Sequence, residues 1–211
     1  MIFLELGTFL YFLTASILLT IAPGPDNLYL LTKSLSAGAK AGVILSAGLA
    51  SGIIFHTFLV MVGVAAIIQN SPFAMNLLKI FGATYLLFLA FKSFQAARAN
   101  KKISMQKSDS QAANLELYRR GVLMNVLNPK VLLFFLAFLP QFVNLSADNA
   151  STQIILLGIT FAVQAFLIFS AIAICAGHVR KFILQKKNLG QIFNFIEAAV
   201  LSIIAISLIF L

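Results

Sequence analysis

Residues 4–27 read LELGTFLYFLTASILLTIAPGPDN, an apolar run that stops at two prolines and a glycine. The apolar part is long enough to cross a bilayer, which takes about 20 mainly apolar residues. Proline lacks the backbone N–H and clashes with the preceding helical turn, so Pro23 and Pro25 cannot continue this helix. We therefore predict a first membrane span that breaks at Pro23-Gly24-Pro25 and a short helix that restarts near Asp26.

The rest of the chain is similarly apolar. Of the 211 residues, 61% are hydrophobic and only 10% are charged, whereas about 25% charged residues are usual in a soluble domain. The composition therefore excludes an ordinary soluble enzyme and predicts an all-α integral membrane protein. The net charge of +9 is accordingly interpreted as a topology signal rather than as a nucleic-acid-binding surface.

Six stretches are long and apolar enough to form membrane-spanning helices. Within each stretch, apolar residues occupy all faces of the predicted helix, which is typical of buried or lipid-facing helices. The alternation of polar and apolar residues expected of an outer-membrane barrel is missing. The predicted spans are residues 4–22, 41–68, 73–94, 121–143, 152–177 and 189–211.

Basic residues gather in alternate loops, and this pattern predicts the orientation. Loops rich in lysine and arginine stay in the cytoplasm. The loops after the first, third and fifth spans are therefore predicted to be cytoplasmic, with both termini outside, in a cell (inner or plasma) membrane. The 13 of 15 basic residues that follow this pattern are Lys33, Lys40, Lys92, Arg98, Lys101, Lys102, Lys107, Arg119, Arg120, Arg180, Lys181, Lys186 and Lys187.

The chain divides into two halves of three spans each, residues 1–97 and 121–211, joined by a polar cytoplasmic linker of residues 98–120. Because each half has an odd number of spans, the second half inserts upside down, as in transporters built from inverted repeats. The second half also contains a predicted helix break, at Pro129. Paired breaks in two halves point to a transporter's binding site, because they expose backbone groups that lipid cannot satisfy.

Very few charged residues fall at membrane depth. Once loop and interfacial charges are set aside, Asp26, Glu197 and Lys130 remain, and a charge there costs about 2.5–3.5 kcal/mol on insertion scales. Asp26 and Lys130, one from each half, are therefore predicted to pair. In the structural alternative, Asp26 caps the restarted helix and Lys130 reaches the cytoplasmic interface. For Glu197 the alternatives are an interfacial carboxylate near the basic loop and a carboxylate that carries protons.

Small residues mark one face of the second span. Gly48, Gly52 and His56 follow at intervals of four residues, and glycines at this spacing let another helix approach closely. The stripe is compatible with packing within the chain and with a homodimer. His56 is interpreted either as a proton relay or substrate contact or as an inert buried histidine. The sequence has no metal-ligand spacing and no Walker-type glycine loop, so neither a cofactor nor ATP is expected.

Three features together resemble the lysine exporter / homoserine–threonine exporter (LysE/RhtB) family of amino-acid efflux proteins. The resemblance covers essentially the whole chain. It implies export of amino acids or small derivatives from the cytoplasm, driven by the proton gradient. The features are Pro23-Gly24-Pro25-Asp26 after the first span, the series Gly38, Gly42, Gly48, Gly52 and His56 in the second, and the stretch from Asn128-Pro129-Lys130 through Phe134-Phe135 to Phe138-Leu139-Pro140-Gln141-Phe142 in the fourth.

An amino-acid exporter needs an acceptor for the substrate ammonium and a donor for its carboxylate. Asp26 suits the ammonium, while Lys130 or the N–H groups of a restarted helix suit the carboxylate. The alternatives are a lipid-modifying membrane enzyme, for which no base-and-acid arrangement around a serine is visible, and an exporter of heavy metals or other cations. The expected partners are an amino acid, protons and the lipid bilayer, without nucleic acid. The candidate residues for binding and coupling are Asp26, Asn27, His56, Asn125, Asn128, Lys130 and Glu197, and those at the helix breaks are Pro23, Gly24, Pro25 and Pro129.

Overall fold

The computed structural model describes residues 5–63, 72–99, 113–145, 147–185 and 189–210, and every regular element within them is a helix. Four helices are long and unbroken, and the others are short. The long helices are α3 (Ala39–Gly63), α4 (Pro72–Arg98), α7 (Ala150–Gln185) and α8 (Leu189–Phe210). The short ones are α1 (Leu6–Ile21), α2 (Pro25–Ala37), α5 (Asn114–Val126) and α6 (Pro129–Leu133), which continues as the π-helical turn η2 (Phe134–Phe138) and the 3₁₀ turn η3 (Leu139–Phe142).

The helices account for six membrane crossings. α3, α4, α7 and α8 are each long and apolar enough to span a bilayer, either whole or over most of their length. Two bent pairs complete the set: α1 with α2, bent by 57°, and α5 with α6 and its continuation, bent by 50°. With each bent pair counted as one broken span, the expected all-α membrane fold with six spans is confirmed.

Both breaks lie where the prolines predict them. α1 ends at Ile21, and α2 begins with Pro25 after an extended Gly24 with φ −155° and ψ −176°. α5 ends at Val126 and α6 begins with Pro129. Proline suits the first position of a helix, because the N–H that it lacks would have no helical partner there. Each break is therefore followed at once by a new helix.

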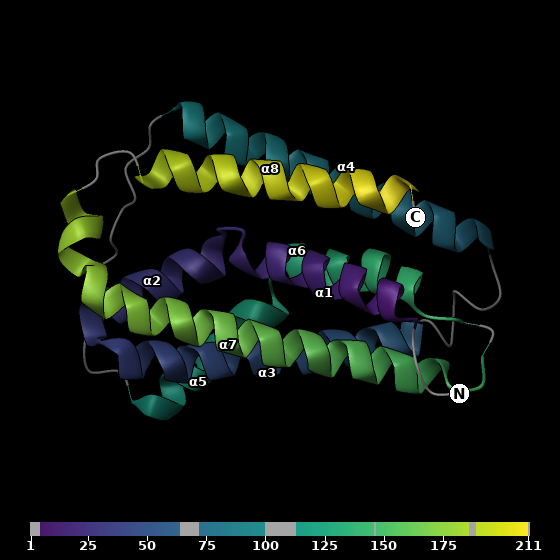
Figure 1. Cartoon of the computed structure of the whole chain (residues 1–211), viewed down its shortest axis with the longest axis horizontal. Coiled ribbons are helices and arrows are strands. Elements are labelled where there is room, and N and C mark those ends of the chain that lie inside the picture. The colour runs from purple at the N-terminus through teal and green to yellow at the C-terminus, as the bar shows by residue number, and fades with distance from the viewer. Residues whose placement is uncertain (1–4, 64–71, 100–112, 146, 186–188, 211) are drawn as a thin grey trace.

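The elements α1–α4 and α5–α8 have the same order, a broken pair followed by two long helices. Each member of the second set runs opposite to its counterpart in the first (Figure 1). As a result, the start of α1 and the end of α8 lie at the same end of the bundle. This antiparallel correspondence is the arrangement expected of inverted repeats.

The broken helices lie between two groups of helices. α4 and α8 pair along one side of the bundle, and α3, α5 and α7 form the other side, with α1 and α6 between them (Figure 1). Aromatic rings fill the space between α1, α6 with its continuation, and α7, with ring centroids 4.7–6.3 Å apart. These rings belong to Phe12, Phe134, Phe138, Phe142 and Phe161.

The glycine face of α3 packs against α5. Gly48 and Gly121 bring the two backbones into contact, because a Cβ on Gly48 would overlap the Tyr118 carbonyl oxygen. One turn further along α3, the bare Cα of Gly52 leaves room for the Asn125 side chain. The close packing expected of this stripe is thus found within the chain itself.

The structure differs from two expectations at the opposite end of the bundle from the start of α1. α5 begins at Asn114 and packs through the buried Leu117, so residues 114–120 are helical rather than part of the linker expected at 98–120. Residues 100–112 of that segment lie outside the described residues. Lys33, assigned by its charge to the loop after the first span, belongs to α2 and is only 2% exposed. In both places the sequence is polar enough to resemble a loop, but the residues form a helix that packs against the rest of the bundle.

Candidate functional site

The two helix breaks meet inside the bundle. At the second break, the Asn128 side-chain amide donates a hydrogen bond of 2.8 Å to the Asp26 carboxylate at the first. The Asn125 side chain lines the same small cavity as this carboxylate. Asp26, Asn125, Asn128 and Lys130 are each at most 7% exposed. Four polar residues from the two halves therefore form one buried cluster.

Side chains close the C-terminal end of α1. The Asn27 amide nitrogen lies 2.9 Å from the Thr20 carbonyl oxygen and 3.2 Å from that of Ala22. The Lys130 ammonium donates to the same Ala22 oxygen at 3.0 Å. Because the C-terminal end of a helix carries a partial negative charge, the first break provides a favourable place for a cation from the second half.

Asp26 and Lys130 share this cluster, but they are not in direct contact. Asp26 is bonded to Asn128 and Lys130 to Ala22, and no ion pair links the two charged groups, both of which the structure describes. The expected pairing is therefore corrected to an attraction across the cluster. Neither structural alternative is observed: α2 has Gly24 as its N-cap residue with no side-chain cap bond, and Lys130 is buried at the break rather than extended to an interface.

Glu197 of α8 reaches the cluster from the side of the α4–α8 pair. Its carboxylate accepts a hydrogen bond of 2.9 Å from the Ser93 hydroxyl of α4. A Cβ on Gly24 would lie 2.9 Å from Lys130 Nζ and 3.4 Å from a Glu197 carboxylate oxygen. The bare glycine thus leaves room for both groups, which form no ion pair with each other. Glu197 is partly buried, and its carboxylate lies at the edge of the cluster, on the side of Gly24.

His56 supports the second break from α3. Its ring is fully buried, and Nε2 lies 3.0 Å from the Asn125 carbonyl oxygen. Because a carbonyl only accepts, Nε2 is the donor in this bond. The ring also packs against Phe135, with centroids 5.7 Å apart. His56 Nδ1 and Asn125 Oδ1 are buried without a hydrogen-bond partner. The structure therefore places His56 behind the cluster, with no bond to Asp26 or Lys130.

Sequence reasoning missed Ser93 and Thr20. Thr20 Oγ1 accepts a 2.9 Å bond from Gln164 of α7, which the sequence marks only as one polar residue in an apolar span. Single hydroxyl residues in membrane helices usually bond to the preceding turn, as Ser16 does to Phe12. The sequence around a serine or threonine does not distinguish such a bond within the helix from a contact with a functional residue of another helix. Knowledge of the neighbouring helix is needed to find them.

The cavity at the cluster is very small. It holds only about 20 Å³, which is room for about one water molecule. Its polar walls are Thr20, Asp26, Asn27, Asn125, Asn128 and Lys130, and its apolar walls are Leu19, Ile53, Val131, Phe161 and Phe169. A small organic molecule could occupy this site only after the helices around it move apart.

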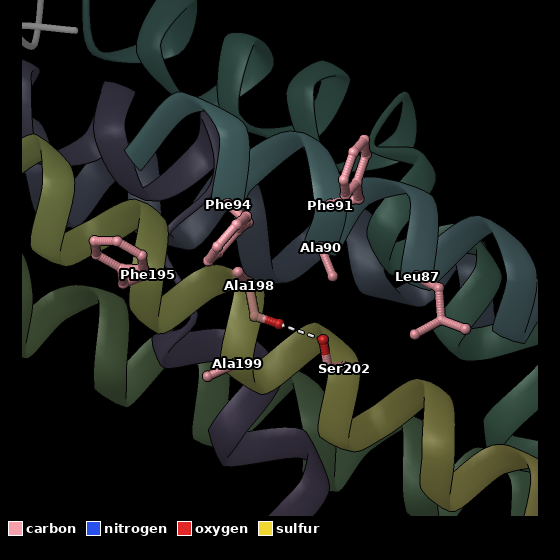
Figure 2. Close-up of a pocket in the computed structure, with 8 residues that line it drawn as sticks. All are labelled: Leu87, Ala90, Phe91, Phe94, Phe195, Ala198, Ala199 and Ser202. Carbon is pink, nitrogen blue, oxygen red and sulfur yellow. Dashed lines mark hydrogen bonds between the residues drawn. The ribbon is translucent and has the colours of Figure 1, made fainter. Parts of the chain in front are cut away.

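A larger groove of about 430 Å³ lies along the seam between α4 and α8 (Figure 2). Its rim is formed by exposed aromatic and aliphatic side chains such as Phe91 and Phe195, and its floor by Ala90 and Ala198. Ser202, also in the groove, bonds to the carbonyl of Ala198 in its own helix. The lining has no charged side chain, so the groove suits acyl chains of the surrounding lipid. It carries none of the features of the cluster at the breaks.

Comparison with known proteins identifies the family. The model of the family described as LysE type translocator matches residues 17–211. The chain is 29% identical over 198 residues to the leucine efflux protein of Enterobacter sp. (strain 638), covering 91% of each chain. It is 28% identical over 194 residues to the leucine efflux protein of Salmonella typhimurium, again covering 91% of each. No solved structure matches.

The family match covers the two helix breaks, the cluster between them and all six spans but the first part of α1. It agrees with the resemblance that the sequence motifs indicate, and it confirms a transporter rather than an enzyme. The chain belongs to the LysE type translocator family.

Proposed function

We propose that this translocator exports neutral amino acids with apolar side chains, leucine among them, from the cytoplasm in exchange for protons. The family match and the relatives support amino-acid efflux. The single observation that carries the finer proposal is the cluster at the two breaks. It holds one buried carboxylate, one buried ammonium group and an apolar wall in the same small space.

The polar side of the cluster suits the two charges of an amino acid. The substrate ammonium would bind Asp26, with the carbonyl end of α1 adding further negative potential. The substrate carboxylate would bind Lys130, which gives up its bond to Ala22. Asn128 and Asn125 would hold the Asp26 carboxylate in place. The empty site thus contains one carboxylate and one ammonium group, as a zwitterionic substrate does. On binding, each of these groups would bind the oppositely charged group of the substrate.

The apolar side of the cluster favours an aliphatic side chain. Leu19, Ile53, Val131 and Phe161 face the cavity, and none of the residues that line it adds a charge beyond Asp26 and Lys130. A lysine side chain would place a second ammonium against these apolar walls, at a high desolvation cost. The leucine named in the relatives' descriptions fits this lining.

Protons and substrate would compete for Asp26. When the site is empty, the carboxylate can take a proton, and a substrate ammonium can bind only after that proton has left. Such competition is sufficient for antiport. An inward electrical gradient supplies about 2.3 kcal/mol per charge per 100 mV, so one proton can drive a useful substrate gradient.

Access would alternate by rocking of the helices that flank the breaks. The cavity at the cluster is too small for an amino acid in this arrangement of the helices, which supports a transport cycle in which they move. The end of the bundle that holds the ends of α4 and α7 and the start of α8 would face the cytoplasm, following the positive-inside rule (Figure 1). Both termini would then lie outside, in the inner membrane of a bacterial cell.

The test is leucine efflux from proteoliposomes with an imposed pH gradient. Asp26→Asn should abolish proton-driven efflux of radiolabelled L-leucine while leaving the amount of reconstituted protein unchanged. Asp148→Asn makes the same chemical change in the loop before α7 and serves as the control, with normal efflux expected. Equal efflux by wild type and Asp26→Asn would refute the role of Asp26. Efflux of L-lysine or of divalent metal ions in place of L-leucine would refute the substrate class.

A further inference from the structure

We infer that Glu197, held by Ser93, is an internal carboxylate that occupies Lys130 until the carboxylate of a substrate displaces it. The inference rests on the proposed function, because it requires the substrate carboxylate to bind Lys130. It gives a role to the α4–α8 pair. None of the residues that line the cavity at the breaks comes from these two helices, yet their only described acid faces the cavity's lysine.

The geometry beside Gly24 supports this assignment. The Lys130 ammonium and a Glu197 oxygen both approach the point where a Gly24 side chain would begin, at 2.9 and 3.4 Å. Lys130 is meanwhile bonded to the Ala22 carbonyl at 3.0 Å. The ammonium is therefore held by a carbonyl, and the Glu197 carboxylate, on a different helix, lies close by without forming an ion pair with it. A small movement of the lysine terminus would exchange one partner for the other.

Ser93 fixes the Glu197 carboxylate in the direction of the break. Its hydroxyl crosses from α4 to α8 to donate the 2.9 Å bond. Ser202 in the same pair of helices bonds only to its own helix, at 2.8 Å (Figure 2). The Ser93 hydroxyl therefore orients a carboxylate, whereas the Ser202 hydroxyl only satisfies its own hydrogen-bonding capacity within its helix. Ser93 is therefore a positioning residue for Glu197.

The consequence for transport follows from competition. A group that occupies Lys130 part of the time lowers the apparent affinity for a substrate carboxylate by the fraction of time that Lys130 is free. The same group also helps to expel a bound substrate, because it competes for the lysine during release. Displacement of Glu197 would, moreover, remove an attraction between the α4–α8 pair and the broken helices. These two helices pack mainly against each other, so substrate binding would loosen the pair from the rest of the bundle.

The first experiment compares ligands with and without a carboxylate. In proteoliposomes, Glu197→Gln keeps the shape and the acceptor for Ser93 but removes the charge. We expect the KM for L-leucine to fall by at least about three-fold, with a lower maximal rate. Inhibition by 3-methylbutylamine, which is leucine without its carboxylate, should be unchanged. Ser93→Ala should lower the KM in the same direction by a smaller factor, and Ser202→Ala, its matched control, should not change it.

An unchanged or higher KM in Glu197→Gln would overturn the inference, and so would an equal shift for leucine and the amine. A second measurement requires no transport. We expect the loss of melting temperature in the Lys130→Met, Glu197→Gln double variant to be smaller than the sum of the two single losses. Strictly additive losses would show that the two groups do not interact. Absence of leucine efflux in the wild type would instead count against the proposed substrate. The melting experiment would still test the interaction between Lys130 and Glu197, because it requires no transport.

Discussion

The two helix breaks differ in how their backbone groups are satisfied. At the second break, the Asn128 side chain accepts a bond of 3.0 Å from the Lys130 backbone N–H, and the Asn128 N–H donates to the Asn125 carbonyl. These two bonds use only residues of the break's own segment, and His56 of α3 adds a third bond, to the Asn125 carbonyl. At the first break, the Ala22 carbonyl depends on Asn27 and on the Lys130 ammonium, which belongs to the other half.

This difference indicates which break responds to a substrate. A helix start that is capped by its own side chain needs no donor from the other half or from a substrate to satisfy its backbone N–H groups. The first break loses a charged donor whenever Lys130 turns to a substrate carboxylate, and the Ala22 carbonyl then keeps only its bond from Asn27. The substrate ammonium can replace that donor. We therefore expect the first break to move during transport while the second acts as a fixed platform.

The largest effect should come from removing the group that links the breaks. Lys130→Met leaves Asp26 and Glu197 without their cation and should abolish L-leucine efflux. Loss of one member of a buried charged set costs about 3–5 kcal/mol, so the unfolding free energy in detergent should fall by several kcal/mol. The exposed Lys92, changed to Met, is the control and should alter neither quantity strongly. Near-normal efflux by Lys130→Met would remove the link between the breaks.

The sequence indicates the breaks and the charges but not their partners. Two prolines around Gly24 and one at position 129 exclude continuous helices, so the positions of both breaks follow from backbone chemistry alone. The scarcity of charge at membrane depth singles out Asp26 and Lys130. Their direct pairing, expected on that basis, is replaced by bonds to Asn128 and to the Ala22 carbonyl. Which polar atoms meet depends on the register between the halves, which no local pattern encodes.

Dependence on the packing between helices also explains why the sequence does not predict the start of α5 or the surroundings of Glu197. Arg119 and Arg120 make the start of α5 resemble a linker, although Leu117 is buried against the bundle. Arg120 lies over the Tyr29 ring at 4.6 Å, a contact that joins the halves and that only the fold provides. Glu197 lies close to the basic loop in sequence, but its carboxylate bonds to Ser93 and lies, like the Lys130 ammonium, beside Gly24. The type of a residue predicts whether it lies in the membrane, but the packing of the helices determines which partners its side chain meets.

An intermediate effect should come from exchanging the acid and the amide between the breaks. Asn128→Asp alone removes the donor to Asp26 and places two carboxylates together, which should lower stability by about 1–3 kcal/mol. Asp26→Asn combined with Asn128→Asp restores an amide and a carboxylate in contact. The melting temperature of the double variant should return close to the wild-type value. L-leucine efflux should stay low, because the charge then lies on the platform instead of the moving break. Full recovery of efflux would show that the two breaks are interchangeable.

The smallest effect should come from the support behind the second break. His56→Gln can keep a donor to the Asn125 carbonyl, so L-leucine efflux and its dependence on the pH gradient should change by no more than about two-fold. His56→Leu removes the donor, but the Asn128 N–H still bonds to that carbonyl, so the expected loss of stability is about 1 kcal/mol. If His56→Gln instead transports leucine without responding to the pH gradient, His56 carries the proton. The platform would then take part in coupling, and the contrast between a moving and a fixed break would no longer hold.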